Sequence, residues 1–282
     1  MNRFLCLFFT LLSCSLLGKI KELPMVVVIA SYKNEKWVEA NLHSVLSQKY
    51  NNFRVIYIDD ASPDKTYDLA KQFIEKHKKN IPVELIHNRV RKRAMHNQYD
   101  AIHSCRDDEI IVTVDGDDWL PHKNVLTYLN SVYSKKEVWL THGTYQQSNG
   151  KSGHSFADGK DVIDQNSFRD SSCPSHLRTF YAWLFKRIKK EDLMYEGEFL
   201  DMTGDLAMMF PMMEMAGDRQ AFISRVLYIY NINNPISVFR KDHDRQLFLD
   251  RWVRALPKYE KLSGQPNLVS EKPCCINPFE EG

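Results

Sequence analysis

The sequence predicts an α/β protein with a doubly wound, mostly parallel sheet, and three observations support this fold class. Met25–Ala30 is a continuous apolar and β-branched run, typical of a strand buried on both faces. Similar runs alternate with stretches of helical spacing as far as Val114. Three of these runs end in polar residues, as ligand-binding strand ends do at the edge of such a sheet.

The first half of the chain divides into four expected strands with three helices between them. The strands are residues 25–30, 53–58, 83–86 and 110–114, and the helices lie around residues 37–46, 67–74 and 94–103. Strands separated by helices pair in parallel through right-handed crossovers. This half is therefore expected to build the continuous part of the sheet.

The pattern becomes looser after Pro121. Helices are expected at residues 125–133 and 206–215, strands at 138–141 and 222–230, and a long loop at 143–159, which is rich in Gly, Ser, Asn and Gln. The methionine-rich stretch 206–215 is typical of a core helix in which Met fills gaps. The chain after Pro257 is rich in proline and is expected to be extended or poorly ordered.

Four segments follow from this organisation. Residues 25–122 and 123–245 form two halves of one domain, and residues 246–282 form a C-terminal tail. Residues 1–24 contain an apolar run that is shorter than the roughly 20 residues a spanning helix needs. Three interpretations stay open for this segment: a cleaved signal sequence, a shallow anchor that makes peripheral membrane contact, or a true start at Met25. Membrane-associated and cytoplasmic locations therefore both stay open.

Composition and missing motifs exclude several classes of protein. The 38 Lys and Arg residues nearly balance 36 Asp and Glu residues, so the net charge of +2 argues against a nucleic-acid partner. Six scattered cysteines with no CxxC spacing form neither a disulfide framework nor a zinc site. No GxGxxG or GxxxxGK[ST] sequence follows a strand, which disfavours dinucleotide oxidoreductases and P-loop enzymes.

Acidic residues gather at the expected carboxyl edge of the sheet. Asp59 and Asp60 end the second strand, and Asp115, Asp117 and Asp118 end the fourth. Like charges this close repel unless a cation or hydrogen-bond donors offset them. Carboxylate oxygens suit Mg²⁺ or Mn²⁺, so a divalent cation that holds phosphate is expected at this edge.

Five motifs in order resemble glycosyltransferase family 2 with the GT-A fold, over about residues 25 to 240. They are SYKNE (31–35), DDASPD (59–64), RAMHN (93–97), VDGDD (114–118) and TGDLAMMF (203–210). The resemblance implies a nucleotide-sugar donor, a metal ion at the DxD motif, and direct displacement with inversion at the anomeric carbon. The looser second half would then be the acceptor side.

The resemblance also implies residue roles. The nucleotide would be bound by Ala30, Tyr32, Glu35, Asp60 and Asp117, with Arg93 near its base or diphosphate. Mn²⁺ or Mg²⁺ would be held within Asp115, Asp117 and Asp118, and the pair that ligates it stays open. Asp205 would be the general base that takes the proton of a hydroxyl group on a glycan, lipid or protein. The expected donor is a UDP-sugar.

Several positions depart from the family pattern or carry two interpretations. His96 stands where an arginine is usual, and a further histidine contact is missing unless His243 supplies it. Arg178 would orient the acceptor or reach the donor phosphates, or it would form a surface salt bridge. Trp119 would stack on a sugar or close the strand end.

Two alternative functions differ from transfer. A non-catalytic protein that binds a nucleotide-sugar or a glycan would tolerate loss of the Asp205 carboxylate, whereas an enzyme would lose transfer and keep donor binding. A nucleotidyltransferase would need a glycine-rich loop after the first strand, and SYKNE provides none.

Overall fold

The computed structural model describes residues 21–135, 137–153, 155–171, 174–235 and 242–266. The hydrophobic part of the N-terminal segment and the end of the tail lie outside the described residues. Within the described ranges, no helix is both long and apolar enough to cross a membrane.

A seven-stranded sheet forms the centre of the protein, in the order β10-β5-β7-β4-β1-β2-β3. All neighbouring strands pair in parallel except β7, which is antiparallel to both β4 and β5. The strands are β1 (Met25–Ser31), β2 (Phe53–Asp59), β3 (Val83–His87), β4 (Ile110–Asp115), β5 (Leu140–Gly143), β7 (Thr179–Tyr181) and β10 (Gln220–Ile223). This confirms the predicted mostly parallel α/β sheet.

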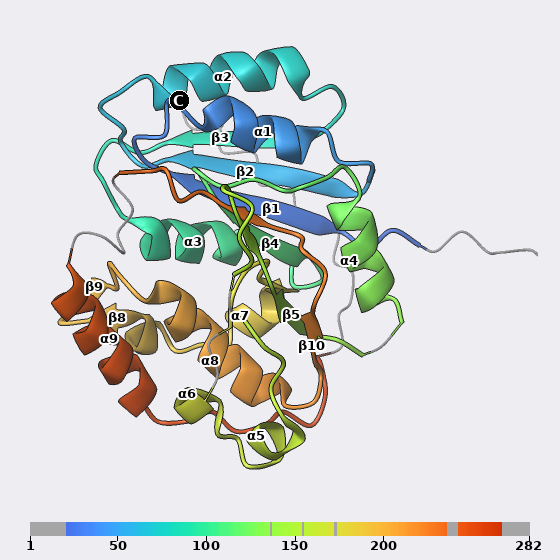
Figure 1. The fold of residues 1–282 in the computed structure, drawn as a ribbon, viewed down its shortest axis with the longest axis vertical. Helices are drawn as coiled ribbons and strands as arrows, with labels where there is room; N and C mark the ends of the chain where they lie inside the picture. The colour runs from blue at the N-terminus through green and yellow to red at the C-terminus, as the bar shows by residue number, and fades with distance from the viewer. Residues whose placement is uncertain (1–20, 136, 154, 172–173, 236–241, 267–282) are drawn as a thin grey trace, which may run out of the picture.

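Helices cover both faces of the sheet (Figure 1). One face packs against α1 (Val38–Leu46), α2 (Thr66–His77) and α4 (Val125–Tyr133). The other face packs against α3 (Ala94–His103), α7 (Ala182–Phe185), α8 (Gly204–Ala216) and α9 (His243–Ala255). Because the central strands are buried on both faces, their sequences are apolar without a period of two.

Smaller elements complete the second half of the chain. They are α5 (Lys160–Asp164), α6 (Phe168–Ser171), the 3₁₀-helix η1 (Lys190–Leu193), and two small sheets, β6 (Gln146–Gln147) with β11 (Ile229–Tyr230) and β8 (Met194–Tyr195) with β9 (Glu198–Phe199). Apart from β6, the described residues between 144 and 159 have no helix or strand, so the expected long loop is largely confirmed.

Three predictions for the second half need correction. Strand β7 was not predicted, because three residues are too short for a periodic pattern. The strand expected at 222–230 is two strands, β10 and β11, because exposed Ser224 and Arg225 interrupt it. The boundary at residue 245 falls inside α9, whose Leu249 and Val253 are fully buried, so the first part of the expected tail belongs to the core.

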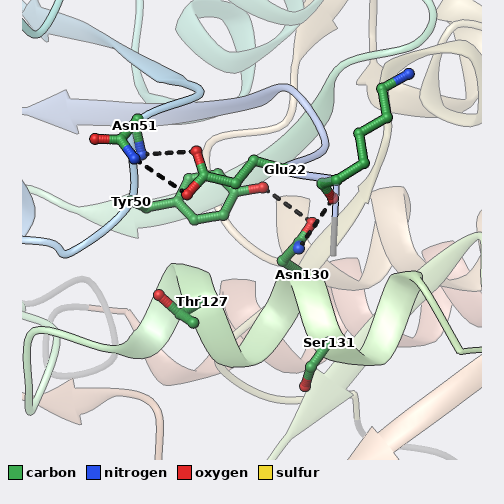
Figure 2. A pocket seen from close by; sticks show the side chains of 7 residues that line it. Glu22, Tyr50, Asn51, Thr127, Asn130 and Ser131 are labelled. Atoms are coloured by element: carbon green, nitrogen blue, oxygen red, sulfur yellow. Dashed lines mark hydrogen bonds between the residues drawn. The ribbon is translucent and has the colours of Figure 1, made fainter. Parts of the chain in front are cut away.

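The chain enters β1 through a polar clamp at the amino ends of the strands. Glu22 accepts hydrogen bonds from the backbone N–H groups of Asn51 and Asn52, at 3.0 and 3.1 Å. Buried Asn130 of α4 accepts from Leu23 N, at 3.0 Å, and donates to the carbonyl of Lys21. Figure 2 shows these side chains around a hollow of about 410 Å³ beside Tyr50. Residues 21–24 are therefore an integral part of the fold.

Candidate active site

The sheet register brings the acidic strand ends together. Ser31 pairs with Asp59 across β1 and β2, and Ala30 pairs with Asp115 across β1 and β4. Parallel strands with this register end level with one another, so their following loops lie at one edge. The expected convergence of SYKNE, DDASPD and VDGDD is therefore observed.

The DxD carboxylates are held by residues that follow β10. Tyr228 Oη donates to Asp118 Oδ2, at 2.7 Å, and the backbone N–H of Asn231 donates to Asp118 Oδ1, also at 2.7 Å. Asn234 Nδ2 donates to Asp117 Oδ2, at 2.8 Å. Both oxygens of buried Asp118 thus have a donor, whereas Asp117 has one oxygen engaged by this segment.

Burial and repulsion make the three carboxylates costly to ionise together. Burial raises the pKa of Asp115 to about 6, and repulsion from Asp117 and Asp205 adds to the rise. Burial also raises the pKa of Asp117, and burial followed by repulsion from Asp117 and Asp115 raises the pKa of Asp118 well above its usual range. A cation at this edge would relieve the repulsion.

The carboxylates fit a divalent cation as a pair rather than as a preformed cage. Among the described residues, no three histidine, cysteine or acidic side chains are grouped closely enough to hold a metal ion. Asp115 and Asp117 are close enough to repel each other and supply the hard oxygen atoms that Mg²⁺ and Mn²⁺ prefer. The role of Asp118 as a further ligand stays a prediction.

Asp60 anchors the loop between β3 and α3. Its carboxylate accepts hydrogen bonds at 2.8 Å from Asn88 Nδ2 and from the backbone N–H groups of Lys92 and Arg93. Burial alone would raise the pKa of Asp60, but the side-chain amide and backbone donors lower it. A hollow of about 510 Å³, lined by Ala61, Ser62, His87, Asn88 and Arg89, opens beside this loop. The hollow lies where the nucleotide base is expected.

The other expected nucleotide residues lie around the same edge. Ala30 is half-buried at the end of β1, and Glu35 is exposed and accepts from Lys65 N at 3.3 Å. The guanidinium group of Arg91 lies 3.8 Å from the centre of the Tyr32 ring. That arginine covers an aromatic face that is otherwise available to a base.

Arg93 points toward the second half of the chain. Its guanidinium group pairs with Asp201, which also accepts three hydrogen bonds from Nε and Nη2 of Arg245 in α9. Arg93 has a φ of 70°, a rare backbone conformation that the Asp60 hydrogen bond supports. The expected contact of Arg93 with the base or diphosphate of the donor stays a prediction. His96 instead packs on Phe199, with ring centres 4.4 Å apart, and His243 is the exposed first residue of α9.

Asp205 lies in the first turn of α8, where the helix dipole favours a carboxylate. Its Oδ2 accepts a hydrogen bond from Arg178 Nη2 at 2.7 Å. The side chain of Asp205 is 40% exposed, while that of Arg178 is 10% exposed. Arg178 therefore does not form a surface salt bridge between two solvated groups.

Several residues of the site were not singled out from the sequence. Tyr228, Asn231 and Asn234 contact the DxD carboxylates from more than 100 positions away in the chain. The asparagine-rich sequence around them was the available signal, since side-chain amides can donate to carboxylates. Trp119, which is half-buried, bridges through its backbone to Ile229.

The fold is that of the GT-A glycosyltransferases. TarS from S. aureus, solved in complex with UDP-GlcNAc, is similar with a TM-score of 0.56 at 15% identity, over 75% of this chain and 59% of that chain. The mannosyltransferase PcManGT from Pyrobaculum calidifontis, solved with GDP-Man and Mn²⁺, has a TM-score of 0.58 at 17% identity, over 85% of this chain and 66% of that chain. At these identities the likeness concerns the fold alone.

The sequence match defines the family. The family described as Glycosyl transferase family 2 matches residues 26–212, and the chain belongs to this family of enzymes. GlyA, a glycosyltransferase from Streptococcus pneumoniae, is 21% identical over 250 residues, which cover 82% of this chain and 33% of GlyA. An uncharacterised glycosyltransferase from Haemophilus influenzae is 26% identical over 125 residues, 44% of this chain and 48% of that protein. The chain thus spans less than half of either relative.

Proposed function

We propose that the chain is an inverting glycosyltransferase that moves a sugar from a UDP-sugar to a hydroxyl group on a glycan, a lipid or a protein, assisted by Mn²⁺ or Mg²⁺. The observation that carries this proposal is that Asp115 lies near both Asp117 and Asp205, which come from two distant segments and whose charges oppose the ionisation of Asp115. Arg178 offsets part of this repulsion at Asp205 and Asp115, and a cation would balance the acidic charge that remains at Asp115 and Asp117.

The donor would lie along the carboxyl edge of β1, β2 and β4. The hollow beside Asp60 would take the base, with Ala30, Tyr32 and Glu35 beside it and Asp117 near the ribose or the metal ion. Two similar folds, TarS and PcManGT, were solved with UDP-GlcNAc and GDP-Man respectively, which supports a nucleotide-sugar donor. We assign UDP first and keep GDP as the tested alternative.

Asp115 and Asp117 would hold the divalent cation, because Asp118 already has a donor on each oxygen. When bound, the cation supplies positive charge that stabilises the leaving diphosphate without a proton donor. PcManGT, a similar fold, was solved with Mn²⁺, which supports the choice of metal.

Asp205 would act as the general base. Among the described residues, its Oδ1 accepts no hydrogen bond, and the side chain is 40% exposed, so an acceptor hydroxyl has access to it. Oδ1 would take the hydroxyl proton while the acceptor oxygen bonds to the anomeric carbon and the bond from that carbon to the diphosphate breaks. One carboxylate and one metal site suffice for this inverting route, in contrast to the carboxylate pair of a glycoside hydrolase.

A thermal unfolding experiment tests the donor and metal assignments together. We expect UDP with Mn²⁺ to raise the melting temperature of the protein, with a smaller effect for GDP, and we expect EDTA to abolish the rise, because a ligand that binds only the folded state stabilises it. Release of UDP from UDP-glucose, UDP-galactose and UDP-GlcNAc would then establish turnover. Binding without turnover in any sugar and acceptor mixture would favour the non-catalytic alternative, and no metal-dependent shift with either nucleotide would contradict the proposal.

A further inference from the structure

Arg178 is an unusual partner for the proposed base, because its charged group is buried in the protein interior. Its side chain is 10% exposed, and its shortest ionic contact is the 2.7 Å hydrogen bond from Nη2 to Asp205 Oδ2. A buried guanidinium group is stabilising only if carboxylates and hydrogen-bond acceptors satisfy it. This burial fixes the position of Arg178 and, through it, one oxygen of Asp205.

The rest of the Arg178 side chain and its backbone are also held. Nε donates to the carbonyl of Pro174, and Nη1 lies 3.3 Å from His176 Nδ1. The backbone carbonyl of Arg178 accepts from the N–H and the hydroxyl of Thr113 in β4. Arg178 is therefore attached to the strand that carries the DxD motif.

His176 extends this connection to the DxD carboxylates. Its ring stacks on Tyr228 at 4.2 Å with an interplanar angle of 9°, and Tyr228 donates to Asp118 at 2.7 Å. Burial, followed by the nearby charge of Arg178, lowers the pKa of His176 well below its usual range, so the ring is neutral. A neutral imidazole can accept a hydrogen bond from the arginine. Contacts thus run without a break from Asp118 through Tyr228, His176 and Arg178 to Asp205.

We propose that Arg178 is a positioning residue for the base: it holds Asp205 Oδ2 so that Oδ1 faces the acceptor hydroxyl, and His176 and Tyr228 keep that arrangement aligned with the DxD carboxylates. This inference rests on the proposed function of Asp205. The proton still passes from the acceptor hydroxyl to Oδ1, and Arg178 gains and loses none. Small errors in the position of a catalytic group cost about 100-fold in rate, so the contact matters chiefly for turnover.

A double-mutant cycle separates positioning from a general structural role. Arg178→Gln, Asp205→Asn and the double variant are compared by the rate of UDP release from whichever UDP-sugar the wild type hydrolyses in Mn²⁺, with water as the acceptor. We expect Arg178→Gln alone to lower kcat by about 10- to 100-fold with the KM for the UDP-sugar changed by less than about twofold. In the Asp205→Asn background, Arg178→Gln should lower kcat by less than about twofold, because the carboxylate that Arg178 positions is gone.

A conservative variant and a control make the outcome unambiguous. Arg178→Lys should recover part of the lost kcat, since lysine keeps the charge but not the planar fork. Arg187→Gln, which alters an exposed arginine that contacts the Trp183 ring, should leave kcat unchanged. The melting temperature of each variant with and without UDP and Mn²⁺ reports whether it folds and binds donor.

Three outcomes would overturn the inference: an equal loss in both Asp205 backgrounds, no recovery with lysine, or a loss that falls on KM rather than on kcat. A fully active Asp205→Asn variant would instead contradict the proposed role of Asp205 itself. The two failures are therefore distinguishable.

Discussion

At the residue scale, the DxD motif of this chain combines two kinds of carboxylate. Asp118 is 1% exposed and bonded on both oxygens, which ties the strand end to the segment after β10. Asp117 keeps more of its bonding capacity free, and Asp115 shares the hydroxyl of Tyr228 only at 3.4 Å. Neighbouring residues of identical type thus differ in how many of their carboxylate oxygen atoms are occupied by hydrogen-bond donors.

His142 gives the folded state a pH dependence that can be measured. This β5 residue is 2% exposed, and burial, together with the charge of Arg178, lowers its pKa to about 4. Asp158 lies 3.8 Å from its Nε2, which is beyond hydrogen-bonding distance. A neutral His142 in the folded state is the consequence.

We predict that the contribution of His142 to the free energy of unfolding falls as the pH drops from 6.5 to about 4, while the raised pKa values of Asp115 and Asp118 act in the opposite direction. The unfolded chain binds a proton on this histidine at a higher pH than the folded chain, so acid favours unfolding. The difference between the usual pKa of 6.5 and the pKa of about 4 in the folded state corresponds to a contribution of at most about 3 kcal/mol to the free energy of unfolding. Urea unfolding should show this as a difference: between pH 7 and pH 5, the free energy of unfolding of the wild type should fall relative to that of His142→Gln. The same substitution at exposed His43 should leave the pH dependence intact, and an unchanged slope in His142→Gln would contradict the prediction.

At the scale of elements, Asp201 connects three parts of the site. It precedes α8, pairs with Arg93 in the loop before α3, and accepts hydrogen bonds at 3.0 and 3.1 Å from Arg245 in α9. Its side chain is 14% exposed, and although burial alone would raise the pKa of Asp201, the two arginines lower it. The loop before α3 and helix α9 therefore share one half-buried anchor.

We predict that Asp201→Asn loosens both elements without unfolding the protein. The substitution removes the charge that holds two arginines, so backbone amide exchange should accelerate in residues 88–93 and 243–248. Hydrogen exchange measured by mass spectrometry would resolve these peptides. Asp100→Asn is a matched control, because Asp100 pairs with Lys92 of the same loop at 2.8 Å but is 48% exposed. Equal exchange in the two variants would show that Asp201 is not the anchor.

Helix α8 illustrates how the carboxylate proposed as the base can occupy a helix with no polar face. Residues Leu206 to Ala216 are all buried, and the buried pair of Glu214 with Arg169, at 2.5 and 2.9 Å, fixes α8 against α6. Asp205 lies just before this buried stretch, in the one turn that reaches the carboxyl edge. The rigid core helix thus holds the proposed base in place.

At the scale of the whole molecule, the candidate site and the N-terminal clamp lie at opposite edges of the sheet. The site occupies the carboxyl ends of the strands, while Glu22 and Asn130 clamp the chain at the amino ends, where it enters β1 (Figures 1 and 2). Changes at the N-terminus should therefore affect stability without entering the site.

We predict that a chain beginning at Met25 is less stable than one beginning at residue 21. The shorter chain loses Glu22 and leaves buried Asn130 without its backbone partners. We expect a loss of about 2 to 3 kcal/mol, or a melting temperature lower by about 5 to 10 °C. Glu22→Gln in the longer chain should cause part of that loss. Equal melting temperatures for the two truncated chains would contradict this role of the clamp.

Much of the first half of the molecule could be predicted from the sequence, because its elements are regular. The run at residues 25–30 and the polar residues after it define β1 and its loop without reference to any other segment. The second half was harder, since β7 has only three residues and the strands β10 and β11 are short. The pairing partners of such strands, and not their own periodicity, decide their structure.

The sequence by itself determined the α/β class, the family, and the set of acidic residues at the carboxyl edge, because each depends on local pattern and on order along the chain. Only the tertiary structure decided that Tyr228 and Asn231 donate hydrogen bonds to Asp118, that Arg93 pairs with Asp201, and that buried Arg178 donates a hydrogen bond to Asp205. These contacts join residues that are 27 to 113 positions apart in the chain. The sequence gives the charge and the hydrogen-bonding capacity of each side chain, but no local pattern encodes which distant donor a carboxylate meets.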